Sequence, residues 1–161
     1  MREPESYIRY IPRTRDLYSS HSPYRWVENA DAPWIPLTKP LNESRVALVS
    51  SAGIYLKGQT PFHTKDDTSI REIPKSALTG DFSVNHFGYR MDGAERDPNC
   101  VFPLKQLQTL EEEGFIGEMA ETAYTFMGGI YSSRRVREEL APQLVERALA
   151  AGADLVYLVP A

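Results

Sequence analysis

The chain has 161 residues, a formal net charge of -4 at pH 7 and 42% hydrophobic residues, which suits one domain with a substantial buried core. The acidic balance and the lack of a basic cluster argue against nucleic acid as a partner. No window reaches the ~18 apolar residues of a membrane span, and one cysteine excludes an internal disulfide. We therefore expect a soluble, cytoplasmic protein without a membrane partner.

Residues 1–43 are rich in aromatic residues and prolines. Closely spaced prolines interrupt helices and central strands, which predicts an irregular arm with a short helix near residues 14–19. The aromatic side chains need a surface to cover. Either they pack over the domain core, or Tyr24, Trp26 and Trp34 belong to a pocket wall or a subunit contact. Residues 44–161 then form the main domain.

A nearly continuous apolar run at residues 45–50 predicts a strand buried on both faces, as in a parallel sheet. Ligands of open α/β sheets bind outside the carboxyl ends of such strands. Ser50, Ser51 and Gly53 are therefore candidates for binding an anionic group through hydroxyls and close backbone approach. The signal has low specificity, because many turns combine serine and glycine.

Residues 55–74 are polar and rich in turn formers, which is typical of a solvated connection. His63 and the acidic residues near it lack the ligand spacing of a metal site. We therefore expect no metal centre.

The segment from residue 81 to residue 103 contains the one cysteine and one of the three histidines. A strand over residues 81–86 is predicted to end at His86, and a polar loop leads on towards Cys100. Binding residues collect in loops at strand ends. In the structural alternative, His86 is a hydrogen-bonded histidine at a strand end and Cys100 is a small buried apolar residue.

Two amphipathic patterns predict helices at residues 103–113 and 132–151, and Pro142 should break or kink the second one near residues 139–141. Apolar runs predict further strands. The chain should fold as a three-layer α/β domain, a mostly parallel sheet with flanking helices. Its predicted strands are 45–50, 81–86, 115–120 and 154–159.

Several segments occur in one order along the chain: VALVSSAGIYLKGQTPF, DTSIREIP, NHFGY, DPNCVFPL, GEMAETAYTFMGG and GADLVYLVP. Together they resemble the selenoprotein B family of glycine, sarcosine, betaine and D-proline reductases, and they look most similar to the short D-proline reductase type. The resemblance runs from about residue 45 to residue 160. A weaker match lies in the arm, in YIRYIPRTRDLY and WIPLTKPL.

This resemblance implies a reductase (oxidoreductase) subunit that cleaves a carbon–nitrogen bond in an amino acid or a related small amine. In the family, a selenocysteine or cysteine follows the strand that matches residues 154–159, in a motif of the form V-P-x-(Sec or Cys)-P-x-C. That position lies just beyond Ala161. Because termination at a selenocysteine codon would produce such a chain, we expect truncation before the redox residue. A natural shortened relative and a subunit completed by another chain are the alternatives.

The resemblance also implies a partner subunit with a pyruvoyl group, and no cofactor within this chain. We expect either a homo-oligomer or a hetero-oligomer with another reductase subunit, because an incomplete sheet exposes a strand edge. The alternative function is a non-catalytic binding or assembly module that keeps the pocket loops of the family.

Residue roles follow from the matched motifs. Cys100 would lie beside the substrate pocket, His86 would give a proton to the leaving amine, and Arg71 would pair with a substrate carboxylate. In a further alternative, Cys100 is itself the nucleophile and His86 activates it. The remaining substrate-binding candidates are Ser50, Ser51, Gly53, His63 and Tyr89.

Overall fold

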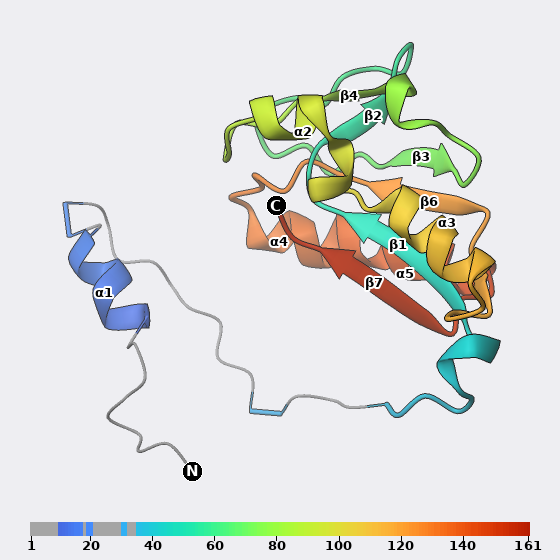
Figure 1. Cartoon of the computed structure of the whole chain (residues 1–161). Coiled ribbons are helices and arrows are strands. Elements are labelled where there is room, and N and C mark those ends of the chain that lie inside the picture. The colour runs from blue at the N-terminus through green and yellow to red at the C-terminus, as the bar shows by residue number, and fades with distance from the viewer. Residues whose placement is uncertain (1–9, 18, 21–29, 32–34) are drawn as a thin grey trace. The chain divides into compact units, whose positions relative to one another are not determined.

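The structure is a computed structural model that describes residues 10–17, 19–20, 30–31 and 35–161 (Figure 1). The chain divides into two units, residues 1–35 and 36–161. In the first unit, helix α1 spans Tyr10–Leu17 and overlaps the short helix expected in the arm. The three aromatic residues for which a pocket or subunit contact was considered, Tyr24, Trp26 and Trp34, lie outside the described residues. Their role stays a prediction.

The second unit is built on a mostly parallel sheet centred on β1 (Arg45–Ser50). β7 (Leu155–Val159) pairs with one edge of β1, while β5 (Glu118–Met119) and β6 (Thr122–Thr125) pair with its other edge, all in parallel. β3 (Arg71–Pro74) extends the sheet in the antiparallel direction beside β6. The predicted α/β class and its mostly parallel sheet are confirmed.

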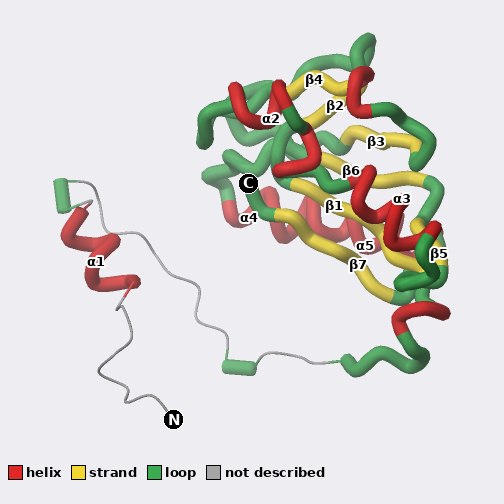
Figure 2. Tube along the Cα trace, viewed as in Figure 1, coloured by secondary structure: helices red, strands yellow, loops and turns green. Residues whose placement is uncertain are grey.

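β1 is central because five of its six residues are buried. Side chains alternate along a strand, and Val46 and Leu48 pack in one apolar cluster with Leu104 and Leu107. These two leucines belong to α3 (Leu104–Glu112), which lies in front of the sheet (Figure 2). The sheet therefore has an apolar core on this face, and further helices cover the opposite face.

The helices on that opposite face interrupt their pattern around Pro142, as the sequence predicts. α4 (Ser133–Arg135) leads into a π-helical turn, Val136–Leu140, and then into α5 (Ala141–Ala150). Pro142 falls in the first turn of α5, directly after the π-helical turn, and a proline cannot donate the backbone bond that a continuous α-helix would form there. None of the helices in the described residues is long and apolar enough to cross a membrane.

The strand predicted at residues 81–86 lies outside the main sheet, and this part of the prediction is wrong. β4 (Phe82–Val84) pairs antiparallel with β2 (Ile54–Leu56) in a separate two-stranded sheet. The cause is Gly53, whose φ of +68° turns the chain out of the direction of β1. The N–H of Asn85 then donates to the Gly53 carbonyl at 3.0 Å.

Three other elements differ from the sequence prediction. The strand expected at residues 115–120 is the two-residue β5, and β6 follows it after a break. β3 forms inside the segment read as a solvated connection. A short helix, α2 (Asp92–Arg96), interrupts the loop expected before Cys100.

Gly53→Ala tests the turn after β1. Gly114 is a matched control, because its φ is +70° and an added Cβ would meet nothing within 4 Å. We expect Gly114→Ala to lower the free energy of unfolding by about 1–2 kcal/mol through backbone strain alone. At Gly53 a Cβ would lie 2.2 Å from the Asn85 carbonyl oxygen, which should cost roughly 1–3 kcal/mol more.

Urea unfolding followed by far-UV circular dichroism measures both variants. Equal losses for the two substitutions would contradict the close approach of the two loops.

Candidate functional site

A cavity of about 340 Å³ lies near the carboxyl ends of the parallel strands, where the sequence places the binding residues. Three segments line it, and they follow β4, β6 and β7. We call it the strand-end cavity. Its lining consists of residues 86–88, residues 128–131 and Ala161.

His86 is the buried polar group of this cavity, with 6% of its surface exposed. Its Nδ1 accepts a hydrogen bond from the Gly88 N–H at 2.8 Å. Its Nε2 is buried and has no hydrogen-bond partner among the described residues. Because Nδ1 accepts, the proton of the neutral ring lies on Nε2. Burial lowers the pKa of His86 below its ordinary value, which favours this neutral form.

Aromatic rings form a row from the surface towards His86. Tyr131 stacks on Phe87 with 6.0 Å between ring centroids, and Phe87 stacks on His86 at 5.9 Å. The ring of Tyr89 also packs against His86, with 4.6 Å between ring centroids. Tyr131 and Phe87 are 83% and 42% exposed, so they form the mouth of the strand-end cavity.

The phenol of Tyr89 is partly buried and hydrogen-bonded to the backbone. Its hydroxyl donates to the Ala52 carbonyl at 2.7 Å. Burial, with a further contribution from negative charge on Cys100, raises the pKa of Tyr89 to about 12. Tyr89 therefore stays protonated at neutral pH, and its hydroxyl proton is committed to the backbone of the loop after β1.

The two serines after β1 have different partners. The Ser50 hydroxyl is fully buried and donates to the Val101 carbonyl at 2.7 Å, which ties the segment before α3 to β1. The Ser51 hydroxyl accepts from the Ala161 N–H at 2.9 Å and donates to the Ala161 carbonyl at 3.3 Å. Ser51 thus holds Ala161 in the lining of the strand-end cavity.

Glycines allow these loops to touch. A Cβ at Gly129 would lie 2.3 Å from the ring of Phe87, and one at Gly128 would lie 2.9 Å from the Ser51 Cβ. The YTFMGG segment signals such a close approach in the sequence. Nothing in the sequence alone indicates Phe87 or Tyr131 as lining residues, because their position depends on how the loops pack.

Of the predicted site residues, His86 alone belongs to the lining of the strand-end cavity. Ser51 and Tyr89 contact lining residues, whereas His63 and Arg71 bond within another loop. His63 is exposed, and its Nδ1 accepts from the Lys65 N–H at 3.1 Å. The Arg71 guanidinium lies 4.3 Å from the ring centroid of Phe62 and donates to the Thr60 carbonyl at 2.8 Å, so it braces its own loop. Neither residue lines the strand-end cavity. No cluster of three or more metal-binding side chains occurs in the described part of the chain.

Cys100 is exposed, so its interpretation as a small buried residue is wrong. It lies at the end of a short 3₁₀ turn, Pro98–Cys100, which the Asp97 side chain caps. His86 makes no hydrogen bond to it, since Nδ1 bonds to Gly88 and Nε2 has no partner in the described residues. The contact that would make Cys100 a histidine-activated nucleophile is therefore not among the contacts of this structure.

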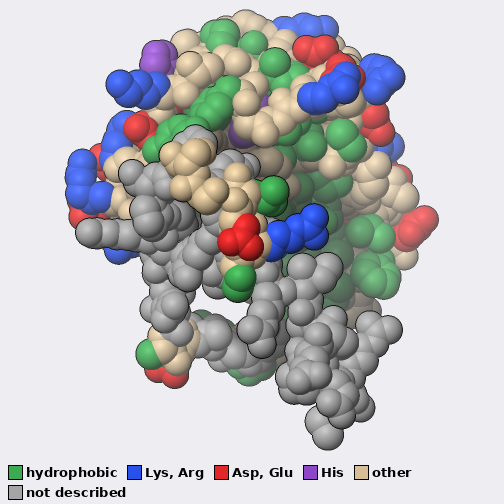
Figure 3. Space-filling model, turned by 90° about the vertical axis from the view of Figure 1, so that its left-hand side faces the viewer, with side chains coloured by type: hydrophobic (Ala, Val, Ile, Leu, Met, Phe, Trp, Pro, Cys, Tyr) green, Lys and Arg blue, Asp and Glu red, His purple; other side chains and the backbone are tan. Residues whose placement is uncertain are grey.

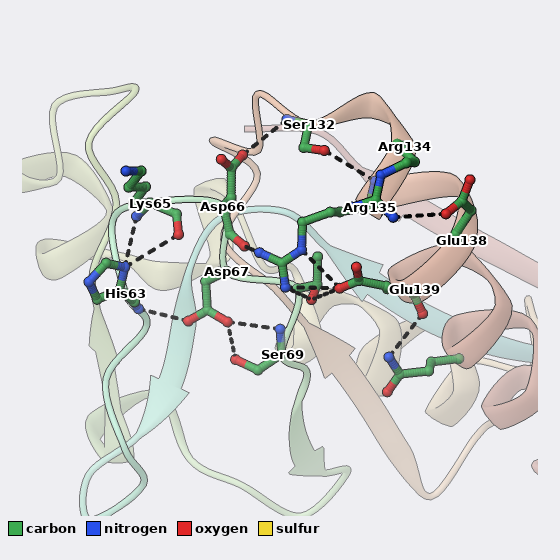
Figure 4. Close-up of polar contacts among 12 residues, drawn as sticks. His63, Lys65, Asp66, Asp67, Ser69, Ser132, Arg134, Arg135, Glu138 and Glu139 are labelled. Atoms are coloured by element: carbon green, nitrogen blue, oxygen red, sulfur yellow. Dashed lines mark hydrogen bonds and ion pairs between the residues drawn. The ribbon is translucent and has the colours of Figure 1, made fainter.

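A polar network fixes the rim of the cavity (Figure 4). The Asp66 carboxylate accepts from the backbone N–H groups of Tyr131 and Ser132, at 2.7 and 3.0 Å. Arg135 donates to the Asp66 carbonyl and pairs with Glu139 at 2.9 Å. The network joins the connection before β3 to the start of α4, although the sequence indicated only a solvated segment there.

Comparisons with known proteins agree with the resemblance seen in the motifs. The model of the family described as glycine/sarcosine/betaine reductase selenoprotein B matches residues 22–159. The chain is 38% identical over 125 residues to D-proline reductase subunit gamma of Acetoanaerobium sticklandii, which covers 78% of this chain and 52% of that protein. This chain therefore spans about half the length of that relative. No solved structure matches at a significant level.

Two relatives from Peptoclostridium acidaminophilum are more distant and longer. Sarcosine reductase complex component B subunit beta is 29% identical over 69% of this chain and 27% of its own length. Glycine reductase complex component B subunit gamma is 30% identical over 74% of this chain and 28% of its own length.

Arg135→Ala tests the network at the rim, and Arg134→Ala is the control. Arg134 makes an exposed ion pair with Glu138, whereas Arg135 joins two segments of the chain. We expect Arg135→Ala to lower the urea midpoint of unfolding more than the control does. It should also speed hydrogen exchange of the Tyr131 amide, because Asp66 then loses its anchor. Identical exchange in both variants would show that the rim does not depend on Arg135.

Proposed function

The chain belongs to the glycine/sarcosine/betaine reductase selenoprotein B family, and from this premise we propose that it is a subunit of a selenol- or thiol-dependent reductase. The proposed reaction is reductive cleavage of a carbon–nitrogen bond in an amino acid or a related amine. One observation carries the assignment of the site. Ala161, two residues after the end of β7, lines the same cavity as the buried ring of His86.

The reaction requires a redox group. Two electrons and two protons enter, the carbon–nitrogen bond breaks, the carbon gains hydrogen and the nitrogen leaves as an amine. Nucleophiles of this kind are low-pKa thiolates or selenolates, commonly with a second thiol that resolves the intermediate. Cys100 is exposed and makes no hydrogen bond to His86. We therefore do not assign this role to Cys100.

The proposed redox group is a selenocysteine or cysteine that follows Ala161 in the full-length protein. When present, that residue supplies the reducing chalcogen. The described residues fit the position of such a group. The Ser51 hydroxyl bonds to both the N–H and the carbonyl of Ala161, the residue that precedes the proposed redox group.

The other residues of the strand-end cavity have supporting tasks. Phe87 and Tyr131 narrow its mouth and limit access of water to the reacting atoms. Gly128 and Gly129 let the loop after β6 approach Ser51 and Phe87. The amine of the substrate would be held by a pyruvoyl group on a partner subunit.

A partner subunit is part of the proposal because the relatives are named as subunits or complex components. β7 offers a surface for assembly. It pairs with β1 alone in the described residues, and Val156, Tyr157 and Leu158 are 40%, 46% and 66% exposed. Figure 3 shows apolar side chains exposed on one face of the molecule. We propose a cytoplasmic hetero-oligomer, with further strands or another subunit along this edge.

Purification of the native gene product from its source cells tests the proposal. After subtraction of any tag, the gene product should have a mass above 18.2 kDa, should contain selenium or a cysteine after Ala161, and should co-purify with a second subunit. The complex should consume at least one of D-proline, glycine, sarcosine and betaine with dithiothreitol as the electron donor. A native mass of 18.2 kDa together with no turnover would instead favour the binding or assembly module.

Ser51→Ala in the native complex tests the positioning of the redox residue. Loss of the hydroxyl frees Ala161, and a misplaced reacting group lowers kcat by roughly ten- to a hundredfold. KM should change little, because the cavity lining is otherwise intact. Ser76→Ala, at an exposed serine outside the strand-end cavity, is the control. Equal kcat for the two variants would remove Ser51 from the mechanism.

A further inference from the structure

We propose that His86 is a neutral hydrogen-bond donor, which presents Nε2–H to a carboxylate oxygen of the bound substrate, and that it is not the acid that protonates the leaving amine. The inference deepens the proposed function and rests on it for the identity of the strand-end cavity as the substrate site. It replaces the role that the sequence suggests for this residue.

The first step of the argument is the position of the ring proton. The Gly88 N–H donates to Nδ1 at 2.8 Å, so Nδ1 is an acceptor in the folded protein. Protonation of Nδ1 would place two N–H groups against each other and break this bond. The contact is tight, since a Cβ at Gly88 would lie 2.8 Å from the His86 Cε1. The backbone therefore selects the Nε2–H form.

The second step is the environment of the ring. Burial is the cause of its lowered pKa, and no charged group contributes to that shift. The titratable group packed on the ring is the phenol of Tyr89, which stays protonated because its pKa is about 12. A histidine that stays neutral in this way is a poor general acid at neutral pH.

The third step is the missing acceptor. Buried donors in folded proteins almost always have a partner, and each exception needs an explanation. His86 is 6% exposed, and its Nε2–H has no partner in the described residues. A ligand that brings an acceptor would supply what the protein itself leaves out.

A second donor lines the same cavity. The Gly129 N–H is bonded to the sulfur of Met127 at 3.2 Å, and a thioether is a weak acceptor. An oxygen of a bound ligand could replace the sulfur as the acceptor of this N–H. A carboxylate has two oxygens and forms stronger hydrogen bonds than a neutral carbonyl group. The lining contains no Asp or Glu that would repel it.

Nuclear magnetic resonance of the chain labelled with ¹⁵N-histidine tests the first two steps. Long-range ¹⁵N–¹H correlations distinguish the tautomers, and the spectrum of His86→Gln assigns the His86 signals. We expect a neutral ring with its proton on Nε2 at pH 7, and the same form persisting below the ordinary histidine pKa of about 6.5. A proton on Nδ1, or an imidazolium ring at pH 7, would overturn the proposal.

Titration with acetate tests the acceptor. We expect acetate to shift the Nε2–H resonance of His86, and ethylamine at the same concentration to leave it unchanged. His86→Gln keeps an N–H near the position of Nε2, so acetate affinity should stay within about threefold of the parent. His86→Leu removes the donor and should weaken binding about tenfold. Circular dichroism confirms that both variants are folded. Equal weakening of acetate binding in His86→Gln and His86→Leu would contradict the inference.

Turnover in the native complex separates this inference from the proposed function. As a donor, His86 can be replaced by Gln with most of kcat retained, whereas a general acid requires an ionisable group. Loss of turnover in His86→Gln, with acetate binding intact, would restore histidine as the acid and overturn the inference while the reductase function stands. Absence of turnover in the parent complex would instead count against the proposed function alone.

Discussion

The parallel pairing of β1 on both of its edges is the constraint on which the rest of the structure depends. β7 takes one edge while β5 and β6 take the other, so the loops that follow β1, β6 and β7 leave the sheet at one end. Because parallel strands are buried on both faces, neither the strand nor its register can shift without exposing the core. The strand-end cavity is therefore a product of the sheet, and its loops need only small adjustments to form it.

Close contact between the loops beside the strand-end cavity is the second property of this end of the sheet. Glycines occupy three points of close contact between these loops. The space that a side chain would need is filled by the Asn85 carbonyl at Gly53, by the Phe87 ring at Gly129 and by the Ser51 side chain at Gly128. The same crowding places the His86 ring against the Gly88 amide, so one backbone N–H decides which ring nitrogen carries the proton. A backbone contact thereby sets the chemistry of a side chain.

Much of the fold could be predicted from local pattern, and much of the site could not. The continuous apolar runs of β1 and β7 predicted two parallel strands, and Pro142 predicted the break in the last helix. Burial was predicted correctly for β1 alone, because β7 lies at an edge of the sheet and three of its five residues are exposed. Membership of β4 in a separate sheet depends on the turn at Gly53, which a strand pattern does not encode. Family motifs drew attention to His86, Ser51 and Tyr89. The bonds of Ser51 to Ala161, and a His86 Nε2 that is buried without a partner in the described residues, arise only when distant loops pack.

Two methionine sulfurs accept hydrogen bonds from backbone N–H groups of the cavity lining, which makes this lining sensitive to oxidation. The backbone N–H of His86 donates to the Met91 sulfur at 3.1 Å, and Met127 receives the N–H of Gly129. Met91 is partly exposed whereas Met127 is fully buried, so peroxide reaches Met91 first. Oxidation to the sulfoxide adds an oxygen to the sulfur that accepts this hydrogen bond, and it exchanges a soft acceptor for a strongly polar one. Oxidative damage would then displace the main chain that carries His86, even though no cysteine had reacted.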